Sequence, residues 1–199
     1  MTQIDTTMTP DSRSNTLTTA DLMARIGVLQ RNYWATYDPA DVIRLDLSNQ
    51  VIRQMDLRHA FLRGVDLEAT DLTESDMTWA RILYGHLSRA RLDNVRLFKS
   101  CLSLADLQAT RFRGANLRKS EIVDSDARHA DFTEANLIRC NLTWSDMRAA
   151  RCVGADFRES NLYGTNFDGA DLTGTDFRGA YLKATQFGDA LLQEALFDD

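Results

Sequence analysis

The sequence predicts an all-β solenoid, in which short extended segments coil and stack along one axis. Two observations support this: an uninterrupted hydrophobic repeat of five residues, and a scarcity of proline, with Pro10 and Pro39 the only two. An α-helix repeats about every 3.6 residues and a strand every second residue, so neither alone gives a period of five. The repeat therefore determines the fold class.

The repeat begins at Leu47, and its central residue recurs every five positions to Phe197, at 31 positions without insertion or deletion. The central residue is Leu, Ile, Met or Phe everywhere except Ala127 and Cys152. Two positions earlier, every unit after the first three has a small residue. One position earlier, Asp or Asn fills 17 of the 31 positions. The unit therefore reads A-(D/N)-L-x-x.

The spacing within the unit predicts the path of the chain. In an extended segment, the central residue and the small residue two positions earlier point the same way. The chain must then turn so that the next pair also points inward. Turning roughly a right angle per unit closes a square coil after about four units, so the repeat predicts about eight coils. A narrow bore cannot hold two large side chains per unit, which explains the small residue.

This pattern, with ADLTG at residues 170–174 as a clear copy, resembles the pentapeptide repeat family over residues 45–199. The resemblance implies a right-handed quadrilateral β-helix. Family members that protect DNA gyrase imitate DNA with an acidic rod and dimerise through their C-terminal ends. The resemblance makes both properties expectations to be weighed for this chain.

The residues before the repeat are predicted to form two segments. Residues 1–17 are rich in Thr, Ser and Asp without periodicity, which is typical of disorder. Residues 18–42 are predicted to form a short α-helical cap, with one apolar face formed by Leu22, Ile26, Leu29 and Tyr33. We expect the cap to cover the first coil of a repeat domain spanning 43–199, since a bare solenoid end exposes core and unpaired backbone. A dimerisation or partner helix is the alternative.

Composition excludes several classes of protein. No apolar run approaches the roughly 20 residues of a membrane span, and the N-terminus lacks the pattern of a secretory signal. Three cysteines without CxxC spacing indicate a reducing, cytoplasmic location. The 29 acidic and 23 basic residues give a net charge of −6, which argues against direct nucleic-acid binding.

The charge is unevenly distributed along the chain. Residues 43–153 contain 15 acids and 17 bases, a net charge of +2. Residues 154–199 contain 9 acids and 3 bases, a net charge of −6. The predicted rod is therefore mildly basic in its middle and acidic toward its C-terminal end.

With four units per coil, central residues 20 positions apart share a face, and each face is named here by its first central residue. The Leu47 and Ile52 faces are polar. The adjoining Leu57 and Leu62 faces collect apolar and aromatic residues among Arg and Lys, a mixture typical of protein interfaces. Ten residues are the predicted partner-binding set: Trp79, Leu83, Tyr84, Phe98, Leu104, Val123, Ile138, Trp144, Tyr163 and Tyr181. The alternative is a ladder that only stabilises the fold.

The C-terminal end is the second predicted surface. Leu191 and Leu196 occupy positions where Asp or Asn is usual, and Phe197 is the last central residue. These three apolar residues are predicted to form an end-to-end homodimer contact.

The sequence contains no motif for catalysis and none for a cofactor or metal. His86 and His129 share a face but lie two coils apart, too far to hold one metal. Cys101 is predicted to be exposed, and Cys140 and Cys152 are predicted to point inward. The Asp and Asn of the repeat are predicted to bond backbone amides at the corners of the coil.

The predicted function is therefore non-enzymatic: a scaffold or adaptor that binds another protein along the aromatic and basic side of the rod. The alternative is a DNA-mimicking gyrase regulator or drug-resistance protein that uses the acidic residues 154–199.

Overall fold

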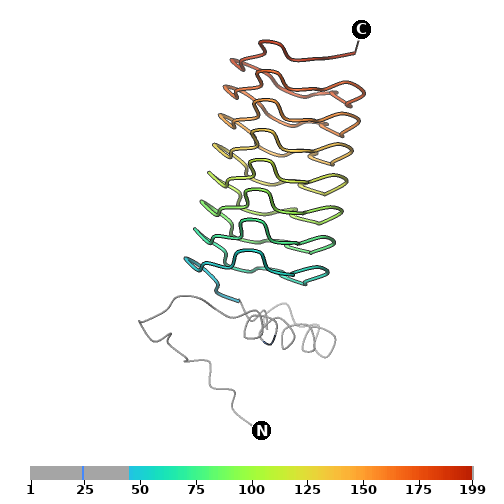
Figure 1. Ribbon diagram of the computed structural model, residues 1–199. Coiled ribbons are helices and arrows are strands. Elements are labelled where there is room, and N and C mark those ends of the chain that lie inside the picture. Colours follow the sequence, from blue (N-terminus) through green and yellow to red (C-terminus); the bar gives the residue numbers. More distant parts are fainter. Residues whose placement is uncertain (1–23, 25–44, 199) are drawn as a thin grey trace.

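The computed structural model describes residue 24 and residues 45–198, and the latter form a stack of coils along one axis (Figure 1). The predicted disordered tail, residues 1–17, lies outside the described residues. The predicted cap, residues 18–42, also lies outside them except for Ala24, which is helical and exposed. No described helix is long and apolar enough to cross a membrane.

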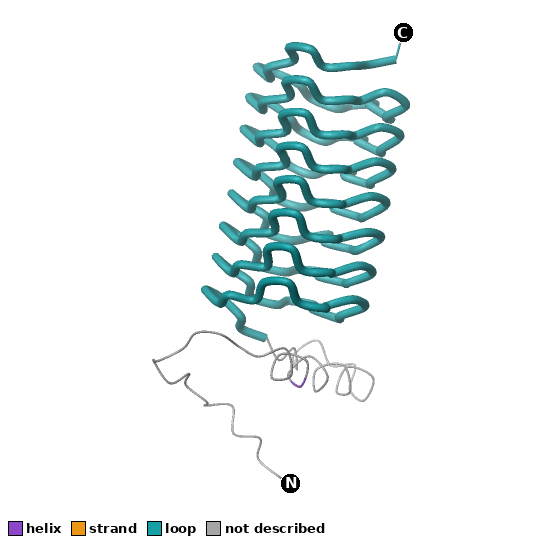
Figure 2. Tube along the Cα trace, viewed as in Figure 1, coloured by secondary structure: helices purple, strands orange, loops and turns teal. Residues whose placement is uncertain are grey.

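The coils are joined by parallel bridges, each pairing one residue with the residue 20 positions later. The series runs from Asp46–Asp66 to Asp176–Leu196. Each coil therefore contains four five-residue units, as the quadrilateral β-helix requires. Every bridge is a single residue long, so residues 45–198 contain no longer strand and no helix (Figure 2).

Backbone hydrogen bonds run along the axis of the rod. From Leu47 to Phe177, the amide of each central residue donates to a carbonyl of the next coil, as from Leu47 to Asp66 at 2.8 Å and from Leu142 to Asn161 at 2.8 Å. Because these bonds are formed at nearly every unit, the register of one coil determines the register of the next.

Two turn residues follow each central residue, and from Asn49 to Glu194 the second has a left-handed backbone at every unit except that of Asp189. Its φ is 58° at Asn49 and 60° at Trp144, and 22 such residues are not glycine. Each costs roughly 1–2 kcal/mol in this conformation. The same residue is bonded to the next coil, as Trp144 N is to Tyr163 O at 3.0 Å. We infer that the hydrogen bonds between coils keep these residues in the left-handed conformation, although their side chains disfavour it.

The Asp and Asn of the repeat cap these turns, which confirms the sequence prediction. In all 17 cases the side-chain oxygen accepts a hydrogen bond from the amide two residues later, at 2.8–3.3 Å. This contact satisfies the first amide of the turn, which explains why the repeat favours a short side chain with an acceptor.

The core fills the bore of the coil. The central residues from Leu62 to Phe177 are at most 2% exposed, and the rings of Phe112 and Phe132 stack at 4.8 Å. Hydroxyl groups two positions before the central residue find hydrogen-bond partners inside the bore. Thr70 and Thr110 each donate to a carbonyl of the preceding coil at 2.7 Å. Polar residues therefore enter the bore without an unpaired group.

Two cysteines point inward, as predicted. Cys140 Sγ lies 2.6 Å from the Leu117 carbonyl oxygen, and Cys152 is a fully buried central residue. Burial raises the pKa of Cys140 to about 11 and raises that of Cys152 further. Both thiols are therefore protonated, and both side chains serve to fill the core.

Asp71 is the most buried carboxylate in an ion pair of the described residues, with 8% of its side chain exposed. Arg53 donates to its Oδ2 at 2.6 and 2.8 Å, and Thr73 Oγ1 donates to its Oδ1 at 2.6 Å. Burial alone would raise its pKa, but these bonds and the charge of Arg91 outweigh burial and lower the pKa to about 2.

We predict that Asp71→Asn destabilises the protein by about 2 kcal/mol at pH 7, from the lowered pKa. A carboxyl with a lowered folded pKa stabilises above its unfolded pKa of about 4 and loses that contribution as pH falls toward 2. The gap between wild type and variant, measured by urea unfolding at pH 7, 4 and 2.5, should therefore close on acidification. Asp189→Asn, which removes an exposed carboxylate outside any ion pair of residues 45–198, is the control. A gap that does not change with pH would contradict the prediction.

Candidate interaction surface

The ten residues predicted to bind a partner lie on the surface, but to different degrees. Five are exposed: Trp79 (45%), Tyr84 (47%), Leu104 (42%), Trp144 (55%) and Tyr181 (52%). The other five are half-buried: Leu83, Phe98, Val123, Ile138 and Tyr163. In residues 45–198, the remaining exposed large apolar residues are Val51 and four residues of the last coil.

Three of these aromatic residues form one cluster across successive coils. Trp144 and Tyr163 meet edge to face at 5.1 Å, and Tyr163 stacks on Tyr181 at 6.2 Å. The indole lies against Gly164, where a Cβ atom would come within 2.6 Å of the ring atom Cζ3. Glycine at this position therefore allows the indole to lie flat on the backbone.

A second cluster surrounds Trp79 on the Leu57 face. His59 stacks on the indole at 6.5 Å with an interplanar angle of 9°, and Lys99 Nζ lies 4.3 Å from the ring centroid. His59 and Lys99 belong to the coils on either side of Trp79. Lys99 also lies 5.6 Å from the Phe98 ring, and Arg63 covers Tyr84 at 5.2 Å. The structure thus joins aromatic rings and cations by cation–π contacts.

The four aliphatic members lie beside these clusters without ring contacts of their own. The turns of Leu104 and Val123 are adjacent, because the Leu104 amide donates to the Val123 carbonyl at 2.9 Å. The turn of Ile138 lies next to the turn of Lys119 on the Leu57 face, since the Ile138 carbonyl accepts a hydrogen bond from Lys119 N at 3.0 Å. Leu83 precedes Tyr84 in one turn.

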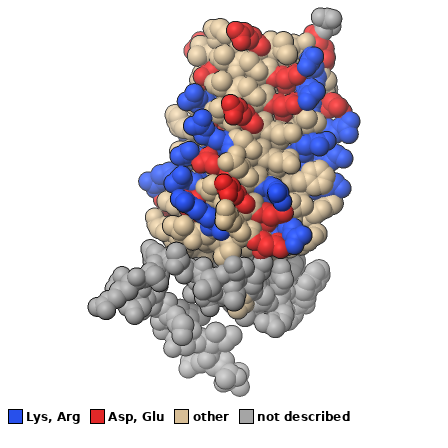
Figure 3. Space-filling model, viewed as in Figure 1, with Lys and Arg blue, Asp and Glu red and all other residues tan. Residues whose placement is uncertain are grey.

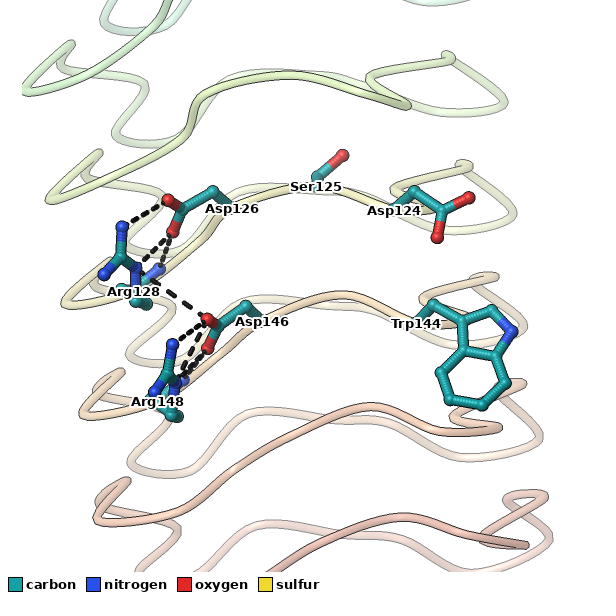
Figure 4. Close-up of a pocket in the computed structure, with 7 residues that line it drawn as sticks. All are labelled: Asp124, Ser125, Asp126, Arg128, Trp144, Asp146 and Arg148. Carbon is teal, nitrogen blue, oxygen red and sulfur yellow. Dashed lines mark hydrogen bonds and ion pairs between the residues drawn. The ribbon is translucent and has the colours of Figure 1, made fainter.

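On the Leu47 face, which adjoins the Leu62 face, carboxylates and guanidinium groups neutralise one another. Arg128 clasps Asp126 and Arg148 clasps Asp146, each at 2.6 Å, and Arg128 also approaches Asp146 at 3.8 Å (Figure 4). The Arg128 hydrogen bond lowers the pKa of Asp126. Burial opposes the shift at Asp146, but Arg148 still lowers that pKa. Carboxylates held ionised in this way link neighbouring coils at the surface and are poorly suited to proton transfer.

Trp144 and Asp124 border the same shallow hollow as these ion pairs, at its other end (Figure 4). Among the described residues, no three His, Cys, Asp or Glu side chains gather closely enough to hold a metal ion. Cys101 is half-buried rather than exposed as predicted, because its Sγ packs 3.6 Å from Ser103 Oγ.

The last described coil has the apolar surface that was predicted as a dimer contact. Leu191 is 50% exposed, Leu196 is 47% exposed and Phe197 is 40% exposed. The Phe197 ring stacks on Phe177 at 5.2 Å and so continues the core to this end. Leu192, a central residue at 38% exposure, belongs to the same surface and was not singled out from the sequence.

Comparison with protein families identifies the repeat. The family model described as "Pentapeptide repeats" matches eight copies, in residues 53–82, 100–137, 110–148, 140–179, 150–189 and 160–199. No curated protein gives a significant sequence match.

Several solved structures are similar. HetL, a pentapeptide repeat protein involved in heterocyst differentiation regulation from the cyanobacterium Nostoc sp. strain PCC 7120, is 20% identical with a TM-score of 0.30; 86% of this chain and 94% of HetL are covered. QnrB1, a plasmid-mediated fluoroquinolone resistance protein, is 18% identical with a TM-score of 0.37; 78% and 84% are covered. Rfr23 from the cyanobacterium Cyanothece 51142 is 21% identical with a TM-score of 0.30; 64% of each chain is covered.

Gly164 offers a test of how Trp144 is held. Gly164→Ala should destabilise the protein by about 2 kcal/mol, because alanine strains the left-handed backbone and displaces the indole from Tyr163. Gly169→Ala is the matched control: its φ is also 68°, but no atom lies within 4 Å of the added carbon. It should cost only the backbone strain of about 1 kcal/mol.

Thermal unfolding measures both costs. Trp144 fluorescence, recorded with Trp34 and Trp79 replaced by Phe, should shift only in Gly164→Ala. Equal shifts in the two variants would show that the indole does not depend on this glycine.

Proposed function

Because this chain belongs to the pentapeptide repeat family, whose fold is the right-handed quadrilateral β-helix, we propose that it is a non-enzymatic scaffold that binds another protein along its side. The binding surface is the adjoining Leu57 and Leu62 faces. The observation that carries the proposal is the exposure of Trp79, Tyr84, Leu104 and Trp144, each 42–55% exposed, on this one side of the rod.

Exposed rings among cations favour a protein partner. Contiguous apolar surface on a soluble protein commonly marks an interaction site, and aromatic residues with arginine are enriched at interfaces. In Figure 3, Lys and Arg gather along the two margins of the visible face, with Asp and Glu among them. Charge of both signs beside apolar surface can orient a partner as well as hold it.

A ladder that only stabilises the fold explains these residues less well. Successive coils place Tyr84, Leu104, Asp124, Trp144 and Gly164 at the same turn position. Asp124 and Gly164 interrupt the apolar column, and Leu104 keeps 42% of its surface exposed. If this column served only to stabilise the fold, we would expect it to be apolar at every coil, with no carboxylate and no glycine in it.

The filled bore also supports binding rather than catalysis. Ligand sites are usually concave and enclose most of the ligand. The central residues of this rod occupy its interior, so the functional surface is the outside. A scaffold uses such a surface directly.

Site-specific photo-cross-linking tests the proposal. Benzoylphenylalanine at Tyr84 or Leu104 should give a discrete protein adduct in lysate of the source organism, because these turns face the partner. The same group at Ala109 or Glu134 is the matched control, since both are exposed and have the same left-handed turn geometry on the polar faces. The same adducts from all four positions, or none from Tyr84 and Leu104, would contradict the proposal.

The alternative function, a DNA-mimicking gyrase regulator or drug-resistance protein, rests on the acidic residues 154–199. Three of the nine acids there are already in ion pairs: Asp156 with Arg158, Glu159 with Arg139 and Asp176 with Arg178. We therefore expect the purified protein to leave gyrase supercoiling unchanged, with and without a fluoroquinolone. Inhibition, or protection from the drug, in an agarose-gel supercoiling assay would favour the alternative.

A further inference from the structure

Within residues 45–198, the Leu57 face has one group of cations that no carboxylate neutralises. Elsewhere on this face, arginines clasp acids at 2.5–2.7 Å: Arg58–Asp56, Arg139–Glu159, Arg158–Asp156 and Arg178–Asp176. The exception lies between these pairs, at the turns Phe98-Lys99 and Arg118-Lys119. Lys99 N donates to Arg118 O at 3.0 Å, so the two turns are directly adjacent.

The carboxylates near these turns are engaged elsewhere or too distant. In residues 45–198, no carboxylate oxygen lies within 4.0 Å of Lys99 Nζ, Lys119 Nζ or the Arg118 guanidinium, whereas Asp76 pairs with Arg96 at 3.5 Å. Glu121 follows Lys119 by two residues and is exposed, but it forms no ion pair with it. The surface here is therefore positive.

The arrangement of these cations is unfavourable within the chain itself. Lys99 and Lys119 occupy the same turn position in successive coils, and like charges opposite one another destabilise a sheet. At Asp126 and Asp146, the rod offsets such repulsion with Arg128 and Arg148. At Lys99 and Lys119, no carboxylate of residues 45–198 offsets the repulsion in this way.

The aromatic side chains beside the cations favour a protein anion over a nucleic acid. Single-stranded nucleic acid is held by bases stacked on open aromatic faces. The Trp79 indole already has two partners within the chain, His59 at 6.5 Å and Lys99 Nζ at 4.3 Å from its ring. The same two coils instead present Leu104 and Val123, which offer apolar contact. The net charge of −6 also opposes binding to a polyphosphate.

We propose that this surface docks an acidic segment of a partner protein that has apolar residues beside its carboxylates. The carboxylates pair with Lys99, Arg118 and Lys119, and the apolar residues pack on Leu104 and Val123. The proposal rests on the scaffold function above and specifies the chemistry of the partner. It explains why charge, aromatic rings and aliphatic residues meet on these coils.

Fluorescence anisotropy with the full chain tests it. The probe is a labelled peptide of alternating glutamate and leucine, compared with the same peptide bearing glutamine for glutamate and with a labelled oligothymidylate of equal charge. The acidic peptide should bind, and Arg118→Glu and Lys119→Glu should each weaken its binding about tenfold or more. Arg151→Glu is the matched control: it makes the same change of charge at an exposed arginine outside any ion pair of the described residues, on the Ile52 face. It should change affinity less than twofold.

The remaining outcomes overturn the proposal. Equal binding of the glutamine peptide would show that charge plays no part, and tighter binding of the oligothymidylate would indicate a nucleic-acid site. An equal loss in Arg151→Glu would mean that only total charge matters. If the cross-links from Tyr84 and Leu104 persist unchanged in Arg118→Glu and Lys119→Glu, the scaffold function stands and the acidic partner does not.

Discussion

The structure depends on the parallel hydrogen bonds that join each coil to the next. Because every bridge connects a residue to the one 20 positions later, a five-residue period in the sequence becomes a set of columns in space. The core stack of Phe112 on Phe132, the ion pair between Arg128 and Asp146, and the stack of His59 on Trp79 each join side chains of neighbouring coils. The ladder even imposes the left-handed turn on 22 residues other than glycine.

The same constraint explains what could be predicted from the sequence. A period of five has one register, so the inward positions, the four faces and the turn-capping Asp and Asn follow from the pattern. The direction in which an outward side chain leans does not, because it depends on the neighbour that the side chain packs against, either one coil away or in its own turn. Trp144 lies on Gly164, 20 positions later, and Cys101 packs against Ser103 rather than toward solvent. The exposure of Val51 and Leu192 at the ends was missed for a related reason, since an end coil has a neighbour on one side only.

The residues that fill the core and the residues of the proposed binding surface are separate sets in this molecule. The bore contains the apolar stacks and the satisfied hydroxyls of residues such as Thr70 and Thr110, and its composition varies little from coil to coil. The turn residues need only tolerate one backbone conformation, so their chemistry can vary widely. Clasped ion pairs, aromatic rings and unpaired cations are therefore all compatible with the same interior. A rod of this kind can acquire a binding surface without any change in its core.

The bridge spacing also determines how such a chain can change length. Removing 20 residues would shorten the rod by one coil and leave every column aligned. Removing five would preserve the interior equally well, yet it would move all later side chains to the adjoining face. A five-residue deletion between Trp79 and Arg118, for example, would move Arg118 and Lys119 to the polar Ile52 face, although the fold would be intact. In this architecture, the core tolerates the loss of a single five-residue unit. The surface keeps its arrangement only when a whole coil of 20 residues is lost.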